Sequence, residues 1–163
     1  MLRIAFLSVL YSGKIPVAPG TWGSLVSVFL GLPFLYFSQE TLLLLAILVG
    51  GIAVREINAY ERAGGLHDDK SIVIDELVGV WIAMSFINLK VLSMYESITA
   101  VALSFVFFRI FDIWKPSFIG KIDREVKGGL GVVGDDALAG FVAGLCVMIV
   151  FAAWDYYAKA WIL

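Results

Sequence analysis

The amino-acid sequence predicts an all-α fold, a polytopic membrane bundle of about five hydrophobic helices. The first observation is composition, because 61% of the 163 residues are hydrophobic and only 16% are charged. Soluble domains average about 45–50% apolar and about 25% charged residues, so this chain has more apolar surface than a small globule can bury. The second is a series of uncharged runs, at 15–39, 41–54, 77–89, 97–108 and 137–154. Lipid is therefore the better solvent for most of the chain.

These runs place the helices along the chain. A bilayer core needs about 20 residues of helix. The expected spans are 22–38, 41–57, 72–88, 96–114 and 136–157. Pro16, Pro19 and Pro33 interrupt the first run, so a broken or re-entrant helix is an alternative there. With no visible repeat or second domain, residues 1–163 are expected to form one membrane-embedded domain.

The basic residues are divided unequally between the two sides of the membrane. Along the expected spans, ten of the twelve fall on one side, and only Lys90 and Lys159 fall on the other. Lys and Arg collect on the cytoplasmic side of membrane proteins. We therefore expect that face, with nearly all the polar loops, to be cytoplasmic.

The first polar segment is "SGKIPVAPGTWGS", residues 12–24. Its prolines and glycines disfavour regular helix until Thr21 or Ser24 caps the next helix. Free backbone N–H groups at that helix start, with Lys14 nearby, would suit a phosphate group. An ordinary loop leading into a helix explains the same pattern.

The second segment, "HDDKSIVIDELVGVWIAMSF", places Asp75 and Glu76 at the edge of an apolar run. If Ser71 caps the helix, both acids lie about one turn inside it. Because acids near lipid are costly, they are expected to face the bundle interior and to mark a functional site. His67 is the only histidine, and by itself it suits a loop or hydrogen-bonding role better than metal binding.

The third segment contains "FRIFDIWKP" and then "GGLGVVGDDALAG". Arg109, Asp112 and Lys115 recur every three residues on one side of a helix that Pro116 ends. They either form a helix-end ion pair with a snorkelling lysine or place two cations around an acid in one cavity. The glycine-rich stretch predicts a pliable loop, with Asp135 and Asp136 at the start of the last helix.

Together these segments bring acids and bases to one membrane face. Hard divalent cations prefer oxygen ligands, and Mg²⁺ usually takes a few carboxylates together with substrate phosphate. Acids for a metal and bases for a phosphate suggest phosphoryl chemistry on a lipid headgroup. Salt bridges inside a transporter are the alternative that the pattern leaves open.

The three segments, in this order, resemble phosphatidylglycerophosphatase A, a bacterial membrane enzyme family, over nearly the whole chain. The resemblance implies hydrolysis of phosphatidylglycerophosphate to phosphatidylglycerol, a Mg²⁺ requirement and a multi-pass place in the bacterial cytoplasmic (inner) membrane. The family's acidic motif positions correspond to His67, Asp68, Asp75, Glu76, Asp112, Asp135 and Asp136. Its basic positions correspond to Arg109, Lys115 and Arg124. The stretch "KPSFI" departs from the family by lacking a second proline after Pro116.

The resemblance yields a set of expected roles. Catalytic residues are expected to be Asp75, Glu76, Asp112, Asp135 and Asp136, and Mg²⁺ ligands Asp75, Glu76, Asp135 and Asp136. Substrate-binding residues are expected to be Lys14, Thr21, Ser24, His67, Asp68, Arg109, Lys115 and Arg124. Asp112 either adds a ligand or orients Arg109. Either a water attacks phosphorus, with a carboxylate as general base, or an aspartate attacks and forms an acyl phosphate.

The sequence lacks the catalytic residues that other classes of phosphatase require. A cysteine phosphatase needs a reactive thiolate in a phosphate loop, but Cys146 lies in an apolar run. One histidine cannot supply the histidine pair of other membrane phosphatases. A lipid-synthesising phosphotransferase and a small transporter are the alternative functions.

The expected partners are the lipid substrate and the bilayer, with no nucleic acid. Gly140 and Gly144 would allow a helix-packing face for a homo-oligomer.

Overall fold

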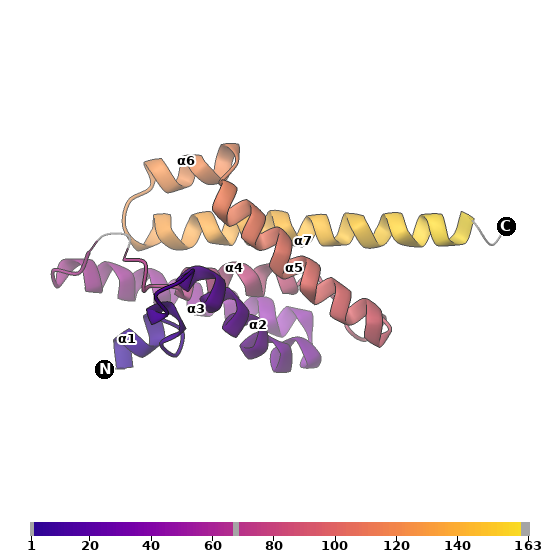
Figure 1. Ribbon diagram of the computed structural model, residues 1–163, viewed down its shortest axis with the longest axis horizontal. Coiled ribbons are helices and arrows are strands. Elements are labelled where there is room, and N and C mark those ends of the chain that lie inside the picture. The colour runs from indigo at the N-terminus through magenta and orange to yellow at the C-terminus, as the bar shows by residue number, and fades with distance from the viewer. Residues whose placement is uncertain (1, 67–68, 161–163) are drawn as a thin grey trace.

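The computed structural model describes residues 2–66 and 69–160, all of whose regular elements are helical (Figure 1). The elements are α1 (Leu2–Leu7), η1 (Ser12–Lys14), α2 (Pro19–Phe37), α3 (Gln39–Arg62), α4 (Ile74–Met84), α5 (Met94–Trp114), α6 (Ser117–Glu125) and α7 (Gly129–Ala160). His67 and Asp68 lie outside the described residues.

Four of these helices are long and apolar enough to cross a membrane: α2, α3, α5 and α7. The all-helical membrane class is thus confirmed, with four candidate spans where about five were expected. Helix α2 is continuous through Pro33, so the first span is not broken. The chain is a multi-pass membrane protein.

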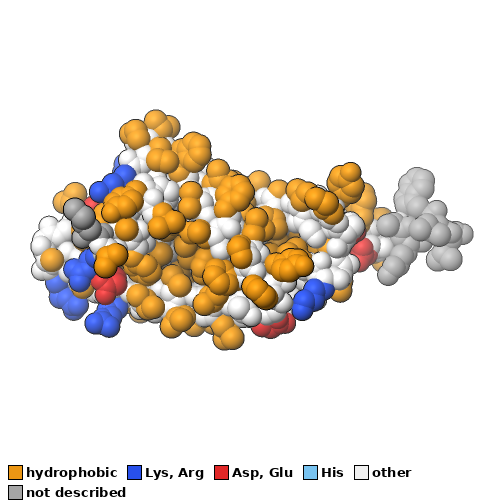
Figure 2. Space-filling model, turned by 90° about the horizontal axis from the view of Figure 1, so that it is seen from below, with side chains coloured by type: hydrophobic (Ala, Val, Ile, Leu, Met, Phe, Trp, Pro, Cys, Tyr) orange, Lys and Arg blue, Asp and Glu red, His pale blue; other side chains and the backbone are white. Residues whose placement is uncertain are grey.

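The surface agrees with a lipid environment. Figure 2 shows hydrophobic side chains over most of one face, with acidic and basic side chains gathered toward its two ends. Large apolar side chains such as Phe29, Ile47 and Ile149 are at least 60% exposed. A soluble protein rarely exposes so continuous an apolar surface.

The expected span at 72–88 contains a short helix that the bundle buries. Helix α4 has only 11 residues, and eight of them are buried, so it is too short for a bilayer core of about 20 helical residues. It contacts α2, α3, α5 and α7. Its apolar residues therefore fill the centre of the bundle, because an apolar run suits a protein core as well as lipid.

Small residues let α7 pack directly on α4. A Cβ atom on Gly140 would lie 2.1 Å from the backbone oxygen of Gly79, and one on Gly144 would lie 2.3 Å from the ring of Phe86. Both glycines thus pack against other residues of the same chain. The expectation that they form an oligomer face therefore does not hold.

Helix α2 begins earlier than expected, because Pro19 occupies a first-turn position where its missing N–H costs nothing. Ala18, in a left-handed conformation with φ 50°, precedes it. Thr21 and Ser24 therefore lie inside the helix, and the Ser24 hydroxyl donates to the backbone oxygen of Gly20 at 2.7 Å. Similarly Val73, and not Ser71, precedes α4, so Asp75 and Glu76 lie in its first turn.

The glycine-rich stretch before Asp135 is helical, and not the loop that the sequence predicts. Helix α7 begins at Gly129, so Asp135 and Asp136 lie about two turns inside it. A Cβ atom on Gly129 would meet the backbone oxygen of Val54 at 2.4 Å. Close packing on α3 thus offsets the helix penalty of glycine, about 1 kcal/mol per residue.

The end of α5 agrees with the sequence. The helix ends at Trp114, and Lys115 adopts a left-handed conformation with φ 44° before Pro116. Helix α6 then returns the chain toward α7 and packs on it, on the side of α7 away from α4 (Figure 1). This turn places Lys115 beside α7.

Candidate active site

A polar cavity of about 430 Å³ opens where α4 begins. Helices α2, α4, α5 and α7 and the segment before α4 contribute to its wall. The residues that line it are Ala18, Pro19, Gly20, Thr21, Asp69, Lys70, Ile72, Asp75, Glu76, Arg109, Asp112, Ile113, Lys115, Val132, Asp135 and Asp136. The three polar segments of the sequence therefore meet in one place.

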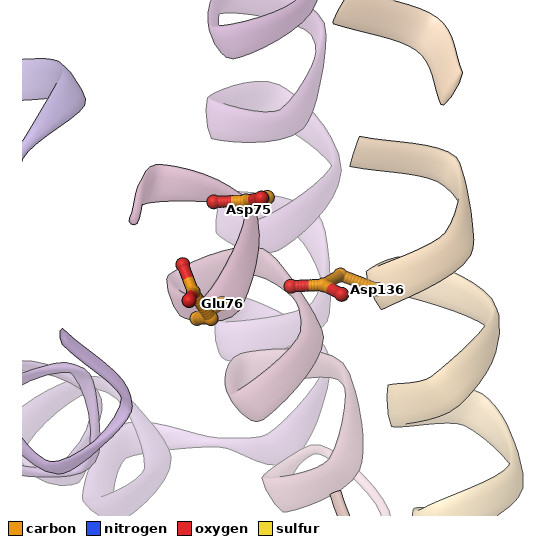
Figure 3. A group of neighbouring side chains, drawn as sticks. All are labelled: Asp75, Glu76 and Asp136. Carbon is orange, nitrogen blue, oxygen red and sulfur yellow. The ribbon is translucent and has the colours of Figure 1, made fainter. Parts of the chain in front are cut away.

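Three carboxylates from two helices converge in this cavity (Figure 3). Asp75 and Glu76 come from the first turn of α4, and Asp136 comes from the facing side of α7. One oxygen atom from each lies within 4.8 Å of the others. We call these residues the acidic cluster.

The acidic cluster contains polar atoms without partners. Asp75 Oδ1, Glu76 Oε2 and Asp136 Oδ2 are buried and have no hydrogen-bond partner among the described residues. Burying a polar group without a hydrogen bond costs free energy, and neighbouring carboxylates repel each other. Three carboxylates this close together are a fitting set of ligands for a hard divalent cation such as Mg²⁺.

Two cationic side chains lie beside the acidic cluster, and each forms an ion pair with a carboxylate. The Arg109 guanidinium pairs with Asp112, lies 4.0 Å from Glu76 Oε1 and donates to Ser24 Oγ at 3.4 Å. Lys115 Nζ lies 2.6 Å from Asp135 Oδ2. We call Arg109 and Lys115 the paired bases. Arg109 and Asp112 form the expected ion pair and line the same cavity as Lys115, which pairs with Asp135.

The helix geometry separates Asp135 from Asp136. Successive residues of a helix point about 100° apart, so Asp136 faces α4 while Asp135 faces Lys115. The group of close carboxylates contains three of the four expected metal ligands and not Asp135. Asp135 is nevertheless in the cavity wall, only 3% exposed.

The first turn of α2, with Ala18 before it, closes one side of the cavity. A Cβ atom on Gly20 would lie 2.3 Å from Glu76 Oε1, so only glycine allows this approach. Thr21 lines the cavity, and Ser24 reaches it through Arg109.

Two other expected substrate-binding residues lie outside the cavity wall. Lys14 sits over the ring of Tyr11, with its Nζ 5.3 Å from the ring centroid. Arg124 is exposed on α6, and a Cβ atom on Gly120 would lie 3.1 Å from its Nη1.

The structure adds two cavity residues that the sequence analysis missed, Asp69 and Lys70. The Tyr60 hydroxyl donates to Asp69 Oδ2 at 2.6 Å, and the Ser71 N–H donates to Asp69 Oδ1 at 2.9 Å. The Tyr60 hydrogen bond is the main reason that the pKa of Asp69 lies below its ordinary value. The position of Asp69 and Lys70 next to Asp68 could have marked them as cavity residues. Nothing in the sequence pointed to Tyr60.

Two relatives are identical to this chain at more than a third of the aligned positions. Phosphatidylglycerophosphatase A of Escherichia coli (strain K12) is 38% identical over 143 residues, which cover 85% of this chain and 77% of the relative. Phosphatidylglycerophosphatase A of Haemophilus influenzae is 39% identical over 145 residues, covering 86% and 82%.

A third relative has a different name. A protein of Bacteroides thetaiotaomicron, provisionally named a phosphatidylinositol-3-phosphatase, is 35% identical over 164 residues, covering 94% of this chain and 98% of the relative. No solved structure is significantly similar.

The sequence model of the family described as Phosphatidylglycerophosphatase A matches residues 5–151. The match includes the acidic cluster, the paired bases and the segment before α4. The chain therefore belongs to the phosphatidylglycerophosphatase A family and is a phosphatase.

Proposed function

We propose that the protein hydrolyses phosphatidylglycerophosphate to phosphatidylglycerol and inorganic phosphate, and that it requires Mg²⁺. One observation supports this most strongly: the acidic cluster, with its unpartnered oxygens, shares a cavity with the paired bases. Family membership supports the choice of substrate. We place the enzyme in the bacterial inner membrane, with the cavity facing the cytoplasm, because the basic residues favour that side.

Asp75, Glu76 and Asp136 would hold the Mg²⁺ ion, since their oxygens converge within 4.8 Å. When bound, the ion neutralises charge on the nonester phosphate oxygens as a Lewis acid. Asp135, which pairs with Lys115, has the separate role of positioning that ammonium.

The paired bases would bind the phosphate that is removed. Arg109 presents a planar fork of N–H donors, whereas Lys115 acts as a point charge. The Arg109 Nε atom is buried without a hydrogen-bond partner among the described residues. Asp112 and Glu76 hold the guanidinium in place, so that it can donate without first reorganising.

A carboxylate of the cavity either takes the proton of the attacking water or attacks phosphorus itself. In the first route the bond between phosphorus and the glycerol oxygen breaks as water adds. In the second the same bond breaks as an acyl phosphate forms, which water then hydrolyses. Hydroxylamine cleaves an acyl phosphate, so trapping with hydroxylamine separates the two routes.

Phosphate release by the detergent-purified protein tests the proposal. Phosphatidylglycerophosphate, phosphatidic acid and phosphatidylinositol 3-phosphate are compared, the last because of the Bacteroides relative. We expect release that prefers phosphatidylglycerophosphate, stops with EDTA and returns with Mg²⁺. Release that persists in EDTA would remove the metal from the proposal, and a preference for another lipid would replace the substrate.

A further inference from the structure

The cavity contains a lysine that the hydrolysis described above does not use. Lys70 lines the cavity and is exposed. Among the residues that the structure describes, no carboxylate forms a salt bridge with Lys70. Its ammonium group is therefore available to bind an anionic group of a ligand.

This lysine differs from the other two cations in the cavity. Arg109 pairs with Asp112, and Lys115 lies 2.6 Å from Asp135. Asp112 and Asp135 offset part of the positive charge of Arg109 and Lys115, and hold both side chains near the acidic cluster. A second anionic group of a ligand would therefore meet Lys70 with the least competition.

The chain around Lys70 is held firmly, although it is not helical. The carboxylate of Asp69 accepts hydrogen bonds from both the Tyr60 hydroxyl, at 2.6 Å, and the Ser71 N–H, at 2.9 Å. We call this arrangement the Asp69 clasp. It joins the segment that carries Lys70 to helix α3.

Close backbone contacts support the Asp69 clasp on both sides. The Val73 N–H donates to the backbone oxygen of Leu7 at 2.9 Å. A Cβ atom on Gly13 would lie 2.3 Å from the Ser71 backbone oxygen, and one on Gly65 would lie 2.3 Å from the Tyr60 ring. The segment is thus fixed between η1, α1 and α3, so Lys70 starts from a defined position on the cavity wall.

We propose that Lys70 binds the phosphodiester of the substrate headgroup while the terminal phosphomonoester lies at the acidic cluster. This inference rests on the proposed function, since it assigns the second phosphate of the same substrate. Lys70 would select lipids in which a phosphodiester is separated from the scissile phosphate by a short alcohol. Tyr60 would be a positioning residue, acting through Asp69.

Substitution of Lys70 tests the proposal. Phosphatidic acid carries a phosphomonoester and no phosphodiester, so the measured quantity is the ratio of kcat/KM for phosphatidylglycerophosphate to that for phosphatidic acid. Lys70→Met should lower this ratio about tenfold, as expected for loss of one charge-assisted hydrogen bond. Lys70→Arg should restore most of it. Lys127→Met removes an exposed cation outside the cavity and should leave the ratio at the wild-type value.

Product inhibition gives a second measurement that does not need turnover of phosphatidic acid. Phosphatidylglycerol keeps the phosphodiester, whereas inorganic phosphate lacks it. Lys70→Met should raise the inhibition constant of phosphatidylglycerol about tenfold relative to that of phosphate.

Tyr60→Phe tests the Asp69 clasp, because it removes the hydroxyl and keeps the ring. We expect the substrate ratio to fall about threefold, an effect that loss of stability alone would not produce. Tyr36→Phe, on an exposed tyrosine of α2, is the matched control.

The outcomes separate the two proposals. If the wild-type protein does not hydrolyse phosphatidylglycerophosphate, the proposed function itself fails. If the wild type does so and Lys70→Met changes neither the substrate ratio nor the inhibition ratio, only the role of Lys70 is overturned.

Discussion

The acidic cluster and the paired bases are neighbours in one cavity but are built differently. Asp75, Glu76 and Asp136 each leave a buried oxygen without a hydrogen-bond partner among the described residues. Arg109 and Lys115 instead each have a carboxylate partner in the protein. The acidic cluster therefore has oxygens free to bind a cation from outside, as proposed above, whereas the paired bases are held in position by the protein itself.

This difference assigns cation binding to the acidic cluster and phosphate positioning to the paired bases in our proposal. Repulsion among the three acids destabilises the fold, and the proposed Mg²⁺ ion would relieve it. The ion pairs of Arg109 and Lys115 fix where a phosphate can sit before it arrives, which is the arrangement that favours charge development in a transition state. Substitutions in the two regions should consequently affect activity and stability in different proportions.

The largest effect is expected in the acidic cluster. Asp136→Asn should lower kcat/KM at least about 100-fold, because it removes a metal ligand. The melting temperature should stay the same or rise, since the neutral amide relieves repulsion. Phosphate release and thermal unfolding of the same sample measure both effects, with Asp155→Asn, an exposed acid at the far end of α7, as the control.

Asp75→Asn should behave in the same way, because its carboxylate faces the same point. Turnover at a near-wild-type rate in either variant would remove that residue from the metal site.

A smaller loss of activity, but a larger loss of stability, is expected for Arg109→Gln. Asp112 and Glu76 would lose the cation that they face, and breaking a buried pair costs on the order of 3 kcal/mol. We expect kcat/KM to fall roughly 10- to 100-fold together with a lower melting temperature. Arg109→Lys should recover stability more than activity, because lysine restores the charge without the planar fork. Equal recovery of both would argue against a role for the fork.

Lys115→Met should have an intermediate effect. Lys115 is one-third exposed, with 33% of its side chain accessible, so solvent screens part of its charge. We expect kcat/KM to fall about tenfold, with a smaller change in melting temperature than for Arg109→Gln. Kinetics at several salt concentrations should show a weaker salt dependence in the variant. An unchanged rate would mean that Lys115 only neutralises Asp135.

The smallest effect is expected for Ser24→Ala. Its hydroxyl accepts from Arg109 at 3.4 Å, near the limit for a hydrogen bond. A loss of roughly twofold in kcat/KM is expected. Ser27→Ala is the matched control, because the Ser27 hydroxyl bonds to Gly23 in the same helix. A tenfold loss confined to Ser24→Ala would show that this contact shortens when substrate binds.

The sequence identified which residues meet in the cavity better than it predicted the helices that carry them. Charged residues in an apolar chain are costly, so Asp75, Glu76, Arg109 and Asp112 could be identified without a structure. The turn after Trp114 was also predictable, because Pro116 ends a helix in a defined way.

Other features depended on long-range packing, which local patterns do not report. The glycines at 129–134 suggest a loop, but the stretch is helical, and Gly129 packs against the backbone of Val54 in α3. The run at 72–88 suggests a full-length membrane helix, but α4 has only 11 residues and its neighbours bury most of them. The clasp between Tyr60 and Asp69 could not be predicted, because nothing in the charged end of α3 around Tyr60 identifies its partner.

Metal binding to the purified protein examines the acidic cluster without turnover. Mn²⁺ can substitute for Mg²⁺ and is followed by electron paramagnetic resonance, in the wild type, Asp136→Asn and Asp155→Asn. We expect saturable binding, displaced by Mg²⁺, in the wild type and in Asp155→Asn, with a large loss in Asp136→Asn. Equal binding by Asp136→Asn and the wild type would contradict this expectation, because the converging oxygens of Asp75, Glu76 and Asp136 would then not form the metal site.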